Sequence, residues 1–175
     1  MTRQTASRTL AAAVTSRGLG FVLMEGPGTL VDWGVKQPKP YRQDRCVAHL
    51  QRLVDQYGPG RVVLEDHTVR PRRCSPRVQS LFRAIHRLAE QRKLRLRVIP
   101  RNRVKTAFTP DGRITKFGIS RHVARVLPVL ARRLPPYRKP WMSEDYRMAI
   151  FDAAALGLAY YHSLPRCHNF LHHHV

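Results

Sequence analysis

The order of apolar segments along the chain limits its fold more than any other feature of the sequence. Three short runs with strand character come first, at residues 9–15, 19–25 and 30–35, and glycine-containing turns separate them. Beyond them, apolar positions at helical spacing alternate with further short apolar runs. An antiparallel three-stranded start followed by alternating helices and strands predicts an α/β chain whose mixed central sheet is flanked by helices.

The remaining elements follow from periodicity and from helix start and stop signals. We expect a helix over 43–57, a strand over 61–64, a helix over 76–92, a strand over 94–99, a short helix or turn over 101–108, a helix over 115–134, and a last helix that Ser143 caps and that runs to about His162. Three antiparallel strands followed by two further strands between helices is the order of the RNase H-like fold. One domain over 1–162 and an irregular, histidine-rich tail over 163–175 are therefore expected.

The charge of the chain is strongly unbalanced. It has 32 Lys+Arg against 11 Asp+Glu, a formal net charge of +21, and 26 of the 32 cations are arginine. A domain this basic repels itself unless it binds a polyanion, and binding then gains from counterion release. Guanidinium groups also suit bidentate contact with phosphate. We predict a nucleic acid as the partner, with DNA favoured and RNA left open, although a GC-rich genome that favours arginine is an alternative source of this composition.

Other classes of protein fit the sequence poorly. No apolar stretch reaches the roughly 18 residues that span a bilayer, so we expect no membrane partner. The apolar run near the N-terminus is short and ends at Arg17, so we expect no secretory signal. Three scattered cysteines, Cys46, Cys74 and Cys167, do not make a disulfide framework, which favours a cytoplasmic location. Cys167 and the tail histidines have the chemistry of zinc ligands, but they lack a second spaced pair, and we expect an unstructured tail.

Acidic residues are few, so their placement is informative. Glu65 and Asp66 come at the end of the predicted fourth strand, where open α/β sheets hold their sites. Asp145 and Asp152 are seven residues apart in the predicted last helix, which places them on one face. Hard carboxylate clusters bind Mg²⁺ or Mn²⁺, so Glu65, Asp66 and Asp152 are the predicted metal ligands. The alternatives are that these carboxylates pair with arginines, and that Asp145 with Glu144 only complements the helix dipole.

Four segments occur in an order that is informative when they are taken together: 15–21, 62–65, Lys105 with Lys116, and 152–159. They resemble four parts of the RuvC-like Holliday-junction resolvases, a family of the RNase H-like superfamily. In the same order, these parts are the first hairpin, the fourth strand with its catalytic glutamate, two lysines near the scissile phosphate, and the last helix. The resemblance covers most of the chain. It implies a metal-dependent endonuclease that hydrolyses phosphodiester bonds of branched or structured DNA during recombination or repair, with Mg²⁺ or Mn²⁺ as cofactor. The catalytic residues that it implies are Glu65, Asp152, Asp145, Lys105 and Lys116.

Two positions depart from this resemblance. The first catalytic aspartate of the family, which bridges the metal ions, falls on Ala13, a side chain without a ligand atom. An acidic or histidine residue one turn before the helix aspartate falls on Ala149, and Asp145 lies one further turn back as a substitute. A second function therefore stands beside the nuclease: a catalytically degenerate RNase H-like module that binds nucleic acid, or supports a larger complex, without cutting.

The basic residues indicate where a nucleic acid would bind. We expect the arginines of helices 76–92 and 115–134, together with Lys105 and Lys116, to form one groove beside the acidic residues. The predicted nucleic-acid-binding residues are Arg17, Arg72, Arg73, Arg77, Arg101, Arg103 and Arg121. Trp33, Tyr137 and Trp141 are interpreted as core or edge residues, with stacking on an unpaired base as the alternative. The sequence leaves open whether the chain is a homodimer or part of a larger complex.

Overall fold

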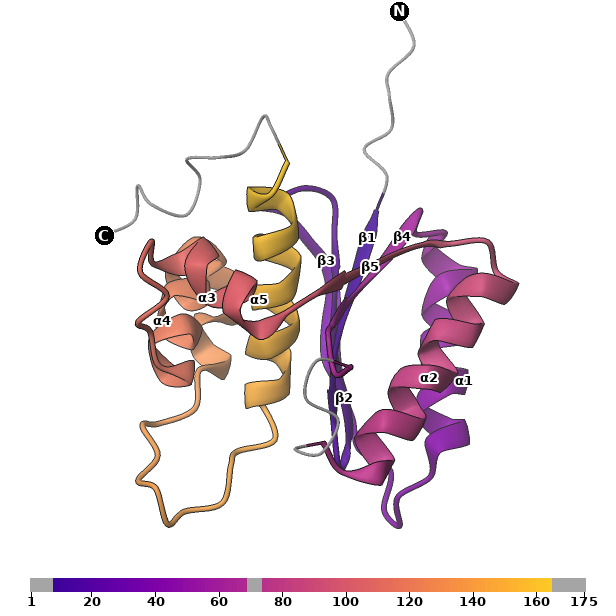
Figure 1. Ribbon diagram of the computed structural model, residues 1–175, viewed down its shortest axis with the longest axis horizontal. Coiled ribbons are helices and arrows are strands. Elements are labelled where there is room, and N and C mark those ends of the chain that lie inside the picture. Colours follow the sequence, from indigo (N-terminus) through magenta and orange to yellow (C-terminus); the bar gives the residue numbers. More distant parts are fainter. Residues whose placement is uncertain (1–7, 69–73, 165–175) are drawn as a thin grey trace, which may run out of the picture.

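A mixed five-stranded sheet with the order β3-β2-β1-β4-β5 forms the centre of the computed structural model, which describes residues 8–68 and 74–164 (Figure 1). The strands are β1 (Thr9–Thr15), β2 (Gly18–Met24), β3 (Leu30–Lys36), β4 (Arg61–Glu65) and β5 (Arg95–Ile99). The first three strands form an antiparallel meander, β4 runs parallel to β1, and β5 runs parallel to β4. This arrangement confirms the predicted RNase H-like sheet, with the first strand at its centre.

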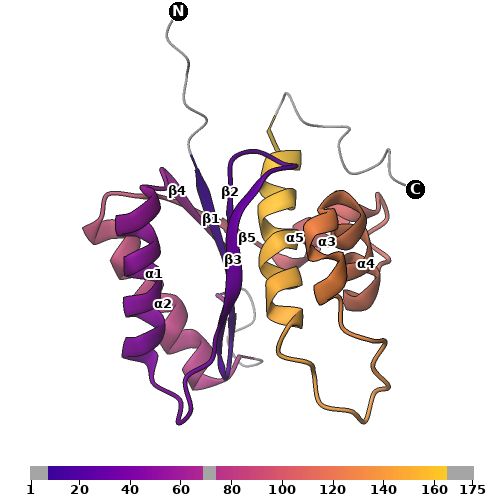
Figure 2. The ribbon, with the colours of Figure 1, turned by 180° about the vertical axis from the view of Figure 1, so that it is seen from behind.

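Helices cover both faces of the sheet (Figures 1 and 2). On one face lie α1 (Gln43–Tyr57) and α2 (Pro76–Gln91); on the other lie α3 (Arg101–Phe108), α4 (Lys116–Val126), the 3-10 helix η2 (Pro128–Arg133) and α5 (Met148–His162). The strand side chains alternate between two cores: Ala11 and Ala13 pack with α5, whereas Leu10 and Ala12 pack with α1 and α2. Among the described residues, no helix combines the length and apolarity that crossing a membrane requires.

Small residues let α5 lie directly on the centre of the sheet. Ala13 of β1 pairs with Gly20 of β2, and a Cβ atom at Gly20 would lie 2.1 Å from the carbonyl oxygen of Ala149. At the other end of α5, the Tyr161 hydroxyl donates a hydrogen bond to Thr9 Oγ1 at 3.0 Å. These contacts hold the first turn of α5 over the carboxyl end of β1.

The predicted helix over 115–134 is wrong in its second half. The α-helix ends at Val126, and the chain continues as the 3-10 helix η2. Leu127 between them has φ −121° and ψ 77°, outside the helical region. The cause is Pro128, because a proline ring disfavours helical backbone at the residue before it.

The last helix begins at Met148, with Arg147 at its cap position, so the expected cap at Ser143 is wrong. The Asp145 carboxylate accepts a hydrogen bond from the backbone N–H of Arg147 at 2.9 Å, which stabilises a turn before the helix. Asp145 is therefore outside α5, and the predicted helical face shared by Asp145 and Asp152 does not exist.

Candidate functional site

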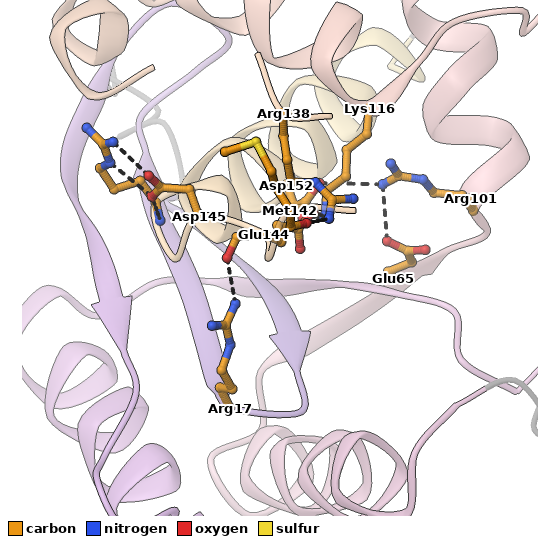
Figure 3. A network of polar contacts seen from close by, with 10 residues as sticks. Arg17, Glu65, Arg101, Lys116, Arg138, Met142, Glu144, Asp145 and Asp152 are labelled. Carbon is orange, nitrogen blue, oxygen red and sulfur yellow. Dashed lines mark hydrogen bonds and ion pairs between the residues drawn. The ribbon is translucent and has the colours of Figure 1, made fainter. Parts of the chain in front are cut away.

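Five charged side chains converge at the carboxyl end of β4, and we call them the charge cluster (Figure 3): Glu65, Arg101, Lys116, Glu144 and Asp152. Arg101 Nη1 lies 3.5 Å from Glu65 Oε2 and 3.8 Å from Asp152 Oδ1. Lys116 Nζ lies 2.8 Å from Asp152 Oδ2 and 2.6 Å from Glu144 Oε1. The structure thus brings Glu65 and Asp152 together through Arg101, a cation of the chain itself, and Lys116 joins Asp152 to Glu144.

The local sequence explains how the two cations reach this position. Pro100 precedes α3 in extended backbone, so that Arg101 becomes the first residue of the helix directly after the carboxyl end of β5. Thr115 Oγ1 accepts a hydrogen bond from the backbone N–H of Gly118 at 2.9 Å, and this cap starts α4 at Lys116. Both cations therefore come from helix starts that lie beside the carboxyl ends of the parallel strands.

Burial and charge act against each other inside the charge cluster. The Asp152 side chain is only 13% exposed. Burial raises the pKa of Asp152 above its ordinary value, while Lys116 and Arg101 act in the opposite direction. Burial also lowers the pKa of Lys116, but the carboxylates of Asp152 and Glu144 outweigh it and raise that pKa overall. Lys116 therefore carries its charge at neutral pH and compensates Asp152.

Ala13 borders the charge cluster without contributing a polar atom to it. Ala12 pairs with Leu64 on the parallel strands β1 and β4, so Ala13 and Glu65 are the next residues along the two strands. Ala13 is 5% exposed and packs in the core beneath α5. A methyl group thus stands where the RuvC resemblance implies a bridging carboxylate.

The donor set of this site does not fit a divalent metal ion. A two-metal nuclease site needs several carboxylate oxygens that are free to coordinate. Here Glu65 and Asp152 already contact cations, and Ala13 has no oxygen to offer. Within residues 8–68 and 74–164, no three Asp, Glu, His or Cys side chains are grouped so that they could hold a metal ion.

Three residues predicted for the site lie outside the charge cluster. Asp66 Oδ1 accepts hydrogen bonds from the Thr68 backbone at 2.8 Å and from its hydroxyl at 2.6 Å, which directs Asp66 into the loop after β4. Asp145 pairs with Arg147 at 2.7 Å, and hydrogen bonds from Arg147 lower the pKa of Asp145. Lys105, in the last turn of α3, forms no ion pair with the cluster. The predicted metal set of Glu65, Asp66 and Asp152 is therefore not assembled.

The predicted nucleic-acid-binding arginines are distributed over several surfaces. Arg17 Nη2 donates a hydrogen bond to the Glu144 carbonyl at 3.0 Å, and the Arg77 guanidinium lies 4.9 Å from the Tyr41 ring centroid. Arg103 and Arg121 are exposed on α3 and α4. The helices α2 and α4 lie on opposite faces of the sheet (Figures 1 and 2), so the arginines of 76–92 and 115–134 do not share one face, and the groove that we expect beside the acidic residues stays a prediction. Arg72, Arg73 and the tail residues Cys167, His168 and 172–174 lie outside the described residues.

Sequence reasoning missed two members of the charge cluster. Arg101 was expected to contact nucleic acid, and Glu144 was expected at most to complement a helix dipole. Nothing in the spacing of these residues links them to Asp152, because the link depends on how α3 and the segment before α5 fold over the sheet. One feature of the sequence does favour such ion pairs. The chain has 32 cations and only 11 acids, so each carboxylate has many cations with which it can pair.

Replacing Lys116 with glutamine is expected to destabilise the fold by about 2 kcal/mol, because a mostly buried carboxylate loses its compensating charge. The loss is smaller than for a fully buried ion pair because the Lys116 side chain is 36% exposed and water screens its charge. Urea denaturation measures the change. Adding Asp152→Asn to Lys116→Gln should recover most of the loss, whereas equal destabilisation by the single and double variants would contradict the role assigned to this pair.

No protein-family model matches the sequence, and no curated protein matches it either. Among solved structures, the chain resembles Thermus thermophilus RuvC in complex with a Holliday junction substrate, with a TM-score of 0.67, 17% identity, and coverage of 94% of this chain and 97% of that one. A second structure of Thermus thermophilus RuvC matches with a TM-score of 0.66 and 16% identity, over 89% of this chain and 95% of that one.

A third solved structure of similar fold comes from a eukaryote. The yeast mitochondrial Holliday junction resolvase Ydc2 matches with a TM-score of 0.60 and 12% identity, over 96% of this chain and 81% of that one. At these identities the likeness establishes the fold, and the RuvC-like fold implied by the sequence motifs is confirmed.

Proposed function

We propose that this RuvC-fold chain binds branched or structured DNA and does not cleave it. The observation that carries the proposal is the charge cluster, in which Arg101 and Lys116 neutralise the carboxylates that the resemblance assigns to metal binding. Ala13 supports the same conclusion, because the position beside Glu65 supplies no ligand. The proposed function is thus that of a degenerate module of the nuclease fold.

The same cluster makes the end of the sheet compatible with a phosphate backbone. Three carboxylates without counter-charges would repel DNA, but Arg101 and Lys116 reduce the formal charge of the cluster from −3 to −1. The side chains of Arg101 and Lys116 are still 31% and 36% exposed, so that each can donate further hydrogen bonds to a phosphate oxygen. The net charge of +21 adds a long-range attraction to any polyanion.

Branched DNA is the favoured ligand class. One of the solved structures with this fold is a complex with a Holliday junction substrate. A four-way junction is therefore the first ligand to test, with duplex DNA and structured RNA as competitors.

The competing function is metal-dependent cleavage of such a junction with Mg²⁺ or Mn²⁺. The fold and the convergence of Glu65 with Asp152 favour it. Two observations disfavour cleavage. Ala13 and Ala149 have no ligand atom for a metal ion, and Arg101 and Lys116 already contact the carboxylates of Glu65 and Asp152.

The exposed arginines on the side of the charge cluster are expected to carry binding. A variant with Arg103, Arg113 and Arg121 changed to alanine should bind a four-way junction at least about tenfold more weakly, because each lost phosphate contact also removes counterion release. Fluorescence anisotropy with a labelled junction measures the affinity.

The matched control removes three exposed arginines from the opposite face, Arg45 and Arg52 of α1 and Arg83 of α2. It has the same loss of net charge and should weaken binding much less. Equal losses in both variants would contradict a binding surface on the α3 and α4 side.

A further inference from the structure

The segment between η2 and α5 exposes aromatic rings to an unusual degree. Tyr137 is 68% exposed, Trp141 78% and Tyr146 53%. Tryptophan is normally highly buried and tyrosine is usually partly buried, since each ring removes considerable apolar area from water. Three exposed aromatic rings in one segment therefore indicate a binding surface for a ligand or a macromolecule.

Cations alternate with these rings. Arg138 and Lys139 lie between Tyr137 and Trp141 in the sequence, and Lys139 Nζ is 5.3 Å from the centroid of the Trp141 ring. Rings that offer flat faces beside positive charges match nucleotides, in which a base stacks on the ring and a phosphate meets the cation. An apolar protein surface would match the rings but would leave the cations without partners.

Contacts at both ends hold this segment against the charge cluster. The Tyr137 ring packs edge-on against Phe117, with centroids 5.3 Å apart, and Phe117 follows Lys116 in α4. Glu144 closes the other end through its ion pair with Lys116 at 2.6 Å. Between these ends, Arg138 Nη1 donates a hydrogen bond to the Met142 carbonyl (Figure 3). The exposed rings are therefore presented beside the place where we expect a DNA backbone.

We propose that Tyr137 and Trp141 form a stacking platform for unpaired bases at a branch point of DNA bound to the charge cluster. This inference rests on the proposed function and narrows its ligand to DNA with bases outside a continuous duplex. In a duplex each base already stacks on its neighbours, so its faces are not available to a protein ring. Because every base has a π face, the platform should tolerate any sequence.

Intrinsic fluorescence tests the platform directly. The chain has two tryptophans, so a Trp33→Phe variant leaves Trp141 as the only reporter. Titration with a thymidine oligonucleotide, or with a junction that carries an unpaired flap, should quench this fluorescence strongly. A blunt duplex bound to the same extent by anisotropy should quench it much less, and binding of the oligonucleotide without quenching would overturn the inference.

Substitutions separate the platform from general DNA binding. Trp141→Ala should weaken binding of the thymidine oligonucleotide by about tenfold, the effect of losing one base–aromatic stack, and should leave duplex affinity nearly unchanged. Trp141→Phe should retain most of the affinity. Val129→Ala, at an apolar side chain of η2 that is 53% exposed, is the control and should change neither affinity.

The outcomes distinguish the two proposals. If Trp141→Ala has no effect on single-stranded binding while the arginine variant still weakens junction binding, the platform is overturned and the proposed function stands. Failure of the unaltered chain to bind any DNA would overturn both.

Discussion

Ala13→Asp should convert this chain into a metal-binding protein that cleaves a four-way junction at a rate at least about 100-fold above the background measured with the unaltered chain. The substitution adds a carboxylate beside Glu65, on the face of the sheet that Asp152 also reaches. Four carboxylates then share the two cations Arg101 and Lys116. The added carboxylate, together with Glu65 and Asp152, gives a divalent ion three ligands at the end of the sheet. Losing one element that stabilises the charge of a transition state typically costs about 100- to 1,000-fold in rate, and this variant restores one.

Two readouts are needed for this variant, because metal binding and cleavage can fail separately. Calorimetric titration with Mn²⁺ reports the site itself, and single-turnover cleavage of a labelled junction reports the chemistry. Ala13→Asn is the matched control, since it adds the same volume without the charge. An Ala13→Asp protein that folds but neither binds Mn²⁺ nor cleaves would show that Glu65 and Asp152 do not form the remains of a nuclease site.

Raising the salt concentration from 50 to 200 mM should weaken junction binding by about 1,000-fold, as for proteins that neutralise several phosphates at once. The reason is the excess of 32 cationic side chains over 11 anionic ones. Most of the cations are guanidinium groups, which suit phosphate contact. Affinity measured by anisotropy over a series of potassium chloride concentrations gives the slope of log affinity against log salt.

The variant of Arg103, Arg113 and Arg121 provides the internal check on that slope. Each phosphate contact that it removes should reduce the magnitude of the slope by about one. A slope near zero for the unaltered chain would contradict binding through the phosphate backbone, whatever the measured affinity.

Much of the fold could be predicted from the sequence because its signals are local. Apolar runs separated by glycine-containing turns predict the meander, and the run 61–64 lies within β4. The end of α4 can also be predicted from the sequence, since Pro128 disfavours helical backbone at Leu127. The start of α5 cannot be predicted in this way. An aspartate that stabilises a turn and an aspartate in the first turn of a helix follow the same sequence pattern.

The site was less accessible to prediction, for a different physical reason. The resemblance to the resolvases indicated Glu65, Asp152 and the missing ligand at Ala13, all of which border the end of the sheet in the structure. The partners of those carboxylates depend on three-dimensional packing: Arg101 reaches Asp152 only because α3 starts directly after β5 and α5 crosses the sheet beside it. Sequence spacing contains no information on such contacts between distant segments.

The most direct test of the account is a single experiment on the unaltered chain, in which binding and cleavage of a four-way junction are measured together with Mg²⁺ or Mn²⁺ present. The account predicts salt-sensitive binding of the junction and no metal-dependent cleavage. Metal-dependent cleavage by the unaltered chain that is abolished by Glu65→Gln or Asp152→Asn would contradict it, because Arg101 and Lys116 would then not prevent these carboxylates from acting as metal ligands.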